Sequence, residues 1–99
     1  MDLAAFKKSL ELAAPPTGLA LALQALWWDA KGDWAKGHDL INDEPGETAA
    51  WAHAYLHRKE GDLGNATYWY GQAGKSVSKA TLDAEWAAIA ASLLKQEGA

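Results

Sequence analysis

The chain has 99 residues, a formal net charge of −4 and no cysteine, and 49% of its residues are hydrophobic. This length suits one domain, and the hydrophobic content suits a packed core, so the composition excludes a wholly disordered chain. The lack of cysteine excludes disulfides and thiolate-bound metals, and the acidic balance argues against nucleic acid as a partner.

The sequence shows no targeting or membrane signal. Residues 1–16 lack the basic segment followed by an apolar run that marks a secretory signal. The longest apolar stretch, residues 19–28, is interrupted by Gln24 and is too short to span a bilayer. We therefore expect a soluble cytoplasmic protein that does not bind membranes.

Six helices are predicted from the spacing of hydrophobic residues, and no segment shows the alternating pattern of a strand. In chain order the helices cover about residues 2–13, 18–31, 34–42, 45–60, 63–73 and 82–96. Five of them have a side chain that can cap the N-terminus: Asp2, Thr17, Asp33, Asp62 and Thr81. Pro45 suits the first position of the fourth helix.

An internal repeat relates the two central pairs of helices. Gly32-Asp33 and Gly61-Asp62 each form a junction between two helices, with an offset of 29 residues. Small residues, Gly37 and Ala66, occupy equivalent positions in the second helices, where they let two backbones approach closely. Such hairpins expose an apolar face, so we expect the first and last helices to cap them.

Residues 50–74 resemble a tetratricopeptide repeat, including its Sel-like variants. Small and aromatic residues around the turn carry the resemblance: Ala54, Gly61-Asp62, Ala66, Trp69-Tyr70 and Ala73. The run HAYLHRKEGD, followed by NA and YWY, is also similar to a group of short bacterial proteins. The resemblance implies one all-α domain over residues 1–99, built of two degenerate helical hairpins with capping helices. It also implies a role in protein interaction.

The leading candidate for a binding surface is an aromatic and basic face of the fourth helix. Trp51, Tyr55 and Arg58 share one side of this helix, and Lys59 lies at its margin. Two aromatic rings beside an arginine suit a peptide carboxylate or an acidic segment. We therefore predict a small protein-interaction module whose partner is an unknown protein or peptide. The alternative is that the two rings pack in the core and Arg58 pairs with an acid.

His53, His57 and Glu60 share another side of the same helix, and they offer an alternative: a small-molecule or metal-dependent enzyme. Histidines four residues apart can bind zinc together, but the glutamate that follows the first histidine in zinc proteases is missing. Two partly buried packing histidines explain the same pattern, so neither a metal nor another cofactor is expected. His38 and Asp39 point about 100° apart on a helix, and we interpret them as solvated surface.

Six tryptophans support a third hypothesis, in which exposed rings mediate self-association and the protein is a monomer or a homodimer: Trp27, Trp28, Trp34, Trp51, Trp69 and Trp86. Wide rings that bridge alanine-rich helices in the core are the alternative. No serine lies in a nucleophile-elbow motif, and the glycines form no phosphate-binding loop. No catalytic residue is therefore predicted.

Overall fold

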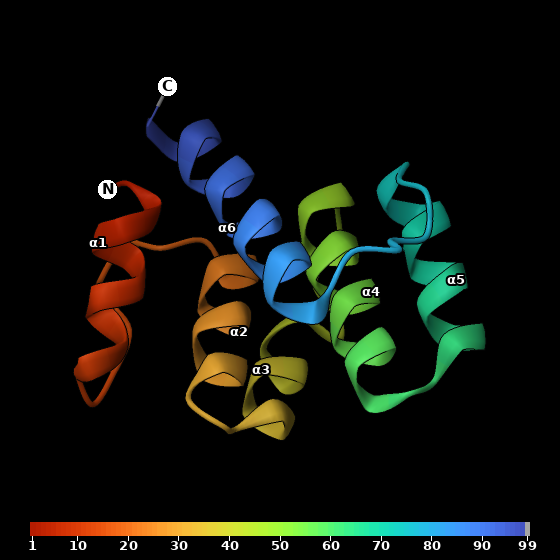
Figure 1. The fold of residues 1–99 in the computed structure, drawn as a ribbon, viewed down its shortest axis with the longest axis horizontal. Coiled ribbons are helices and arrows are strands. Elements are labelled where there is room, and N and C mark those ends of the chain that lie inside the picture. Colours follow the sequence, from red (N-terminus) through yellow and green to blue (C-terminus); the bar gives the residue numbers. More distant parts are fainter. Residues whose placement is uncertain (99) are drawn as a thin grey trace.

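The computed structural model describes residues 1–98 and contains six α-helices and a short 3-10 helix, η1, with no strand in that range (Figure 1). The elements are α1 Leu3–Lys8, η1 Ser9–Glu11, α2 Leu21–Ala30, α3 Trp34–Ile41, α4 Glu47–Glu60, α5 Leu63–Ala73 and α6 Leu82–Gly98. The predicted all-α fold class is confirmed. None of the helices within residues 1–98 is long and apolar enough to cross a membrane.

Side-chain caps begin four helices as predicted. In each case a carboxylate or hydroxyl oxygen accepts a hydrogen bond, 2.8–3.2 Å long, from the backbone amide three residues further on. The four capping residues are Asp2, Asp33, Asp62 and Thr81. These bonds satisfy amide groups that have no partner inside the helix, so they fix where each helix starts.

The predicted end of the first helix is wrong, because α1 ends at Lys8 and only η1 continues it to Glu11. The predicted starts of two other helices are also wrong. The α2 helix begins after Ala20 without a side-chain cap, so Thr17 is not its cap. Gly18 has a φ of +84°, which breaks any helical path from Thr17. The α4 helix begins after Gly46, whose φ of +104° separates Pro45 from the helix. A glycine with a positive φ angle therefore precedes each helix, and both helices begin later than predicted.

Consecutive helices pair as two hairpins, α2 with α3 and α4 with α5. Gly32 and Gly61 turn the chain between the helices of each pair, with φ values of +91° and +90°. The α3 backbone approaches α2 so closely that a Cβ atom on Gly37 would lie 2.6 Å from the carbonyl oxygen of Ala25. Ala66, at the equivalent position of α5, is 1% exposed. The small residues therefore sit at the helix crossings, as the repeat predicts.

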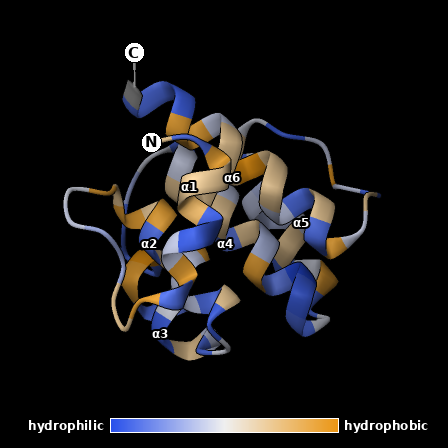
Figure 2. Cartoon of the chain, turned by 60° about the vertical axis from the view of Figure 1, so that its left-hand side comes forward, coloured by the Kyte–Doolittle hydropathy of each residue, from blue (hydrophilic) through white to orange (hydrophobic). Residues whose placement is uncertain are grey.

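The α6 helix lies across both hairpins and packs against α1, α2 and α4 (Figure 1). The Trp86 indole N–H donates to the carbonyl of Leu26 at 2.9 Å, and its ring stacks on Phe6 with a centroid distance of 5.6 Å. Hydrophobic and hydrophilic residues are mixed along the helices (Figure 2), as expected when each helix packs on one side. The α6 helix therefore covers both hairpins, whereas α1 packs against α6 beside the first hairpin (Figure 1), so both terminal helices act as the caps expected from the sequence.

Candidate metal centre

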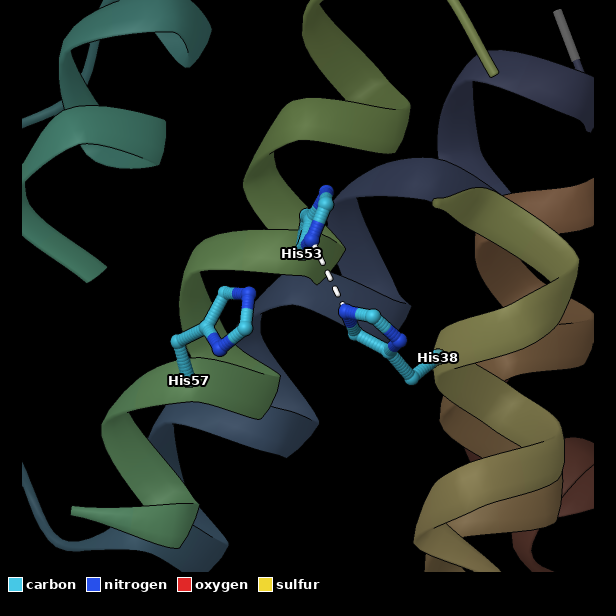
Figure 3. A group of neighbouring side chains, drawn as sticks. All are labelled: His38, His53 and His57. Carbon is cyan, nitrogen blue, oxygen red and sulfur yellow. Dashed lines mark hydrogen bonds between the residues drawn. The ribbon is translucent and has the colours of Figure 1, made fainter. Parts of the chain in front are cut away.

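Three histidines from two neighbouring helices come together between the hairpins (Figure 3). His38 lies on α3, and His53 and His57 lie on successive turns of α4. One ring nitrogen of each lies within 4.8 Å of the other two. The Nε2 atoms of His38 and His53 are 3.1 Å apart and share a hydrogen bond. Nitrogen ligands of tetrahedral zinc lie about 3.3 Å apart, given Zn–N bonds of about 2.0–2.1 Å, so this pair fits one ion.

Glu60 holds the third imidazole in place. Its Oε1 atom lies 2.6 Å from Nδ1 of His57, and the other ring nitrogen of His57 points toward the remaining two histidines (Figure 3). A histidine that binds a metal commonly donates its second N–H to a carboxylate, which fixes the tautomer and the orientation of the ring. The structure therefore adds His38 to the predicted group of His53, His57 and Glu60, and it places Glu60 behind His57 as a support.

A second group of possible ligands shares His57 and adds Glu60 and Asp62. Both carboxylates are exposed to solvent. The Asp62 carboxylate also accepts hydrogen bonds from the backbone amide and the side-chain amide of Asn65, both at 3.2 Å. Because Asp62 is engaged in capping α5, the three-histidine group is the better candidate for a metal centre.

Two tryptophans fix the orientation of the imidazole rings. Trp34 stacks on His38 with a centroid distance of 4.9 Å and an interplanar angle of 9°. Trp69 stacks on His53 at 4.0 Å and 19°. The Trp34 ring is itself fixed, because its indole N–H donates to the carbonyl of Leu56 at 2.8 Å. The imidazoles are therefore held in place by packing, as a preorganised ligand set requires.

Burial keeps His53 and His38 in the neutral form at pH 7. His53 is 2% exposed, and burial, assisted by repulsion from His57 and His38, lowers its pKa to about 4. The pKa of His38 is lowered by burial and by His57, although Asp39 and Glu60 oppose the change. Neutral imidazole is the form that binds a metal, so a metal ion would not have to displace a proton from the charged form of His53 or His38 at pH 7.

The metal-free protein is expected to lose stability as the pH falls from about 6.5 to about 4. The pKa of His53 is about 4 in the folded protein and about 6.5 in the unfolded chain, so in this window the unfolded chain binds more protons. Thermal melts in the presence of chelator would measure the loss. The variant His53→Gln cannot titrate at this position, so it should show a flatter profile between these pH values. Equal slopes for the two proteins would contradict the prediction.

The aromatic and basic face predicted on α4 is engaged with the rest of the chain. Tyr55 is 2% exposed and belongs to the core. The Arg58 guanidinium donates to the carboxylate of Glu85 at 2.8 Å. Trp51 is half-buried, and the Lys75 ammonium lies 4.3 Å from its ring centroid. A peptide on this face would have to displace these contacts, so the geometry favours the histidines as the site. Peptide binding here stays a prediction.

Lys59, the fourth residue of that face, pairs with a buried acid. Its ammonium lies 3.0 and 3.2 Å from the two carboxylate oxygens of Asp29. Burial raises the pKa of Asp29, and the hydrogen bond from Lys59 partly offsets that rise. Lys59 therefore compensates an internal charge, and any attraction of an acidic partner would be weakened by this pair.

His38 is the candidate ligand that the sequence pattern places, wrongly, on the solvated surface. It is half-buried and turned toward α4, whereas the adjacent Asp39 is exposed. The close packing of α3 on α2 at Gly37 brings the next residue to the interface with α4. The repeat contains a usable signal, because stacked units bring the second helix of one against the first helix of the next, but this neighbour was not inferred from the sequence.

The tryptophans offer little free surface for the self-association hypothesis. Trp27 is fully buried and Trp86 is nearly so. The other four are half-buried, and none of the six, all of which lie in the described part of the chain, is exposed. They serve mainly as wide packing residues, and the oligomeric state stays a prediction.

No protein-family model matches the sequence, and neither a curated protein nor a solved structure matches it. The resemblance to tetratricopeptide repeats therefore stays a prediction. The case for a metal centre depends on the geometry of this chain alone.

Proposed function

We propose that this protein binds a transition-metal ion, with zinc as the first candidate, through His38, His53 and His57. The observation that supports this proposal is the convergence of three ring nitrogens within 4.8 Å of one another. Imidazole ligands suit zinc, copper and nickel, whereas magnesium and calcium prefer oxygen. Three protein ligands leave the fourth position of a tetrahedral ion to water or to an external ligand.

The ion would join the two hairpins of the domain. His38 belongs to the second helix of the first hairpin, and the other two histidines belong to the first helix of the second. A metal that binds only the native protein adds its binding free energy to the free energy of unfolding. We therefore propose that the ion stabilises the packing of α3 on α4. Hydrolytic zinc enzymes also leave one position of the ion open for water or substrate. The enzyme hypothesis therefore requires metal binding first and is secondary to it.

Zinc titration of chelator-stripped protein tests the proposal. We expect one zinc ion per chain by elemental analysis. At a free zinc concentration of about 100 times the dissociation constant, the free energy of unfolding should rise by about 2.7 kcal/mol. For a domain of this size the melting temperature should then rise by roughly 10–20 °C. Stripped protein that takes up no zinc and melts identically with zinc and with chelator would exclude the metal centre.

Substitutions separate the ligands from the supporting residue. His38→Ala and His53→Ala should each abolish the response to zinc. Glu60→Gln should keep the one-to-one stoichiometry and weaken binding by about 10–100-fold, the usual cost of losing a supporting carboxylate. Asp39→Asn, an exposed change beside His38, is the matched control and should bind zinc as the wild type does. If His38→Ala retains wild-type affinity, the third ligand is assigned incorrectly.

A further inference from the structure

A cavity of about 420 Å³ opens between α1, η1, α2, α4 and α6. Leu10, Tyr55 and Trp86 contribute apolar surface to it, and Lys7, Asp29 and Asp83 are among its charged residues. Its volume is at the lower end of the range for ligand pockets, about 300–1,000 Å³, so it suits a small ligand. No histidine lines it, so the cavity is separate from the candidate metal centre.

The hydroxyl of Tyr55 is available to a ligand in this cavity. The residue is 2% exposed, and its hydroxyl forms no hydrogen bond with any other group in residues 1–98. Every fully enclosed side-chain nitrogen or oxygen in this part of the chain has a hydrogen-bond partner. Because the Tyr55 hydroxyl has no partner, it is not fully enclosed, and we infer that it faces the cavity that Tyr55 lines. A phenolic hydroxyl can donate one hydrogen bond and accept another, and both positions are free here.

The cavity is lined by a positive charge on α1 and by a negative charge on α6. Asp29 and Lys59 neutralise each other, which leaves Lys7 of α1 and Asp83 of α6. Neither of these two forms an ion pair with any residue from 1 to 98. Asp29, Glu85 and Asp83 add to the effect of burial in raising the pKa of Tyr55, although Arg58 opposes them. With Asp29 paired to Lys59 and Glu85 paired to Arg58, Asp83 is the uncompensated acid near the hydroxyl and favours a cation, whereas Lys7 favours an anion.

We propose that this cavity binds a small zwitterion, a free α-amino acid with an apolar side chain. The ammonium group of the ligand binds Asp83 and the Tyr55 hydroxyl, and the carboxylate binds Lys7. The apolar side chain packs against Leu10 and Trp86. Charge-assisted hydrogen bonds to the ammonium and to the carboxylate, which share one carbon atom of the ligand, make both of its charges necessary for recognition. The proposal does not depend on metal binding, because the two sites share no residue.

Calorimetric titration with three related compounds tests the proposal on the intact chain, in buffer with chelator. L-phenylalanine carries both charges, its amide carries only the positive charge, and its N-acetyl derivative carries only the negative charge. We expect the amino acid to bind at least tenfold more tightly than either derivative. Absence of binding at about 10 mM amino acid, or equal affinity for a derivative, would overturn the proposal.

Variants locate the bound ligand. Tyr55→Phe removes only the hydroxyl, and Asp83→Asn and Lys7→Gln each remove one charge. Each should weaken the binding of L-phenylalanine at least fivefold while circular dichroism shows a folded protein. Lys95→Gln changes an exposed residue of α6 away from the cavity and serves as the control. If these three variants bind as well as Lys95→Gln does, the amino acid does not occupy this cavity.

Discussion

Gly37→Ala is expected to destabilise the protein by about 2 kcal/mol. A Cβ atom at this position would lie 2.6 Å from the backbone oxygen of Ala25, a distance that carbon and oxygen atoms do not tolerate. Because the obstacle is backbone, relief requires α2 and α3 to separate, and overpacking of this kind costs about 1–3 kcal/mol. Separation would also move His38, the residue after Gly37, so the variant should bind zinc more weakly.

The same substitution at Gly71 is the matched control. Gly71 lies in α5, and apart from its chain neighbours and the nearby backbone of its own helix no described atom lies within 4 Å of the position that its Cβ would occupy. Alanine has a higher helix propensity than glycine, so Gly71→Ala should raise the free energy of unfolding by about 0.5–1 kcal/mol. Urea melts of the two variants should therefore move in opposite directions. A Gly37→Ala protein that is at least as stable as the wild type would mean that the α2–α3 contact accommodates a Cβ atom at residue 37.

Arg58→Ala is expected to destabilise the protein by about 3 kcal/mol. The guanidinium pairs with Glu85, whose side chain is 5% exposed, and it also donates to the carbonyl of Ala80. The Tyr70 hydroxyl donates to the second oxygen of the same carboxylate. Loss of the arginine leaves a buried carboxylate with one neutral donor, and breaking such a pair is strongly destabilising. Thermal and urea melts would measure the loss.

A double substitution separates the pair from other effects of the arginine. Arg58→Ala with Glu85→Ala removes both charges, so it should cost less than the sum of the two single changes. Lys95→Ala is the control for removal of an exposed cation and should change stability by less than about 0.5 kcal/mol. If Arg58→Ala melts as the wild type does and loses a bound peptide, the predicted binding face on α4 is correct.

Most of the fold could be predicted from local signals in the sequence. Hydrophobic spacing predicts the six helices, and the caps at Asp33 and Asp62 with their preceding glycines predict the two hairpins. The starts of α2 and α4 could not be predicted, because the positive φ angles of Gly18 and Gly46 are set by the path of the folded chain. Glycine permits such angles but does not require them.

The candidate centre could be predicted only in part. His53 and His57 are neighbours on a single helix, so their spacing of four residues reveals the pair. The contribution of His38 depends on how closely α3 packs against α2 and α4, which is a tertiary property. The burial of Tyr55 depends in the same way on α6, which lies more than twenty residues further along the chain. Helical periodicity shows which residues share a face, but not which element covers that face.

The position of α6 also determines how the free energy of unfolding is distributed. In an extended repeat array each unit contacts only the next, so stability is close to a sum over units, and one end can unfold alone. Here a single helix packs against α1 and against the first helix of each hairpin. Its release would remove packing from all three at once. We therefore expect the chain to unfold in one all-or-none transition, as a small globular domain does.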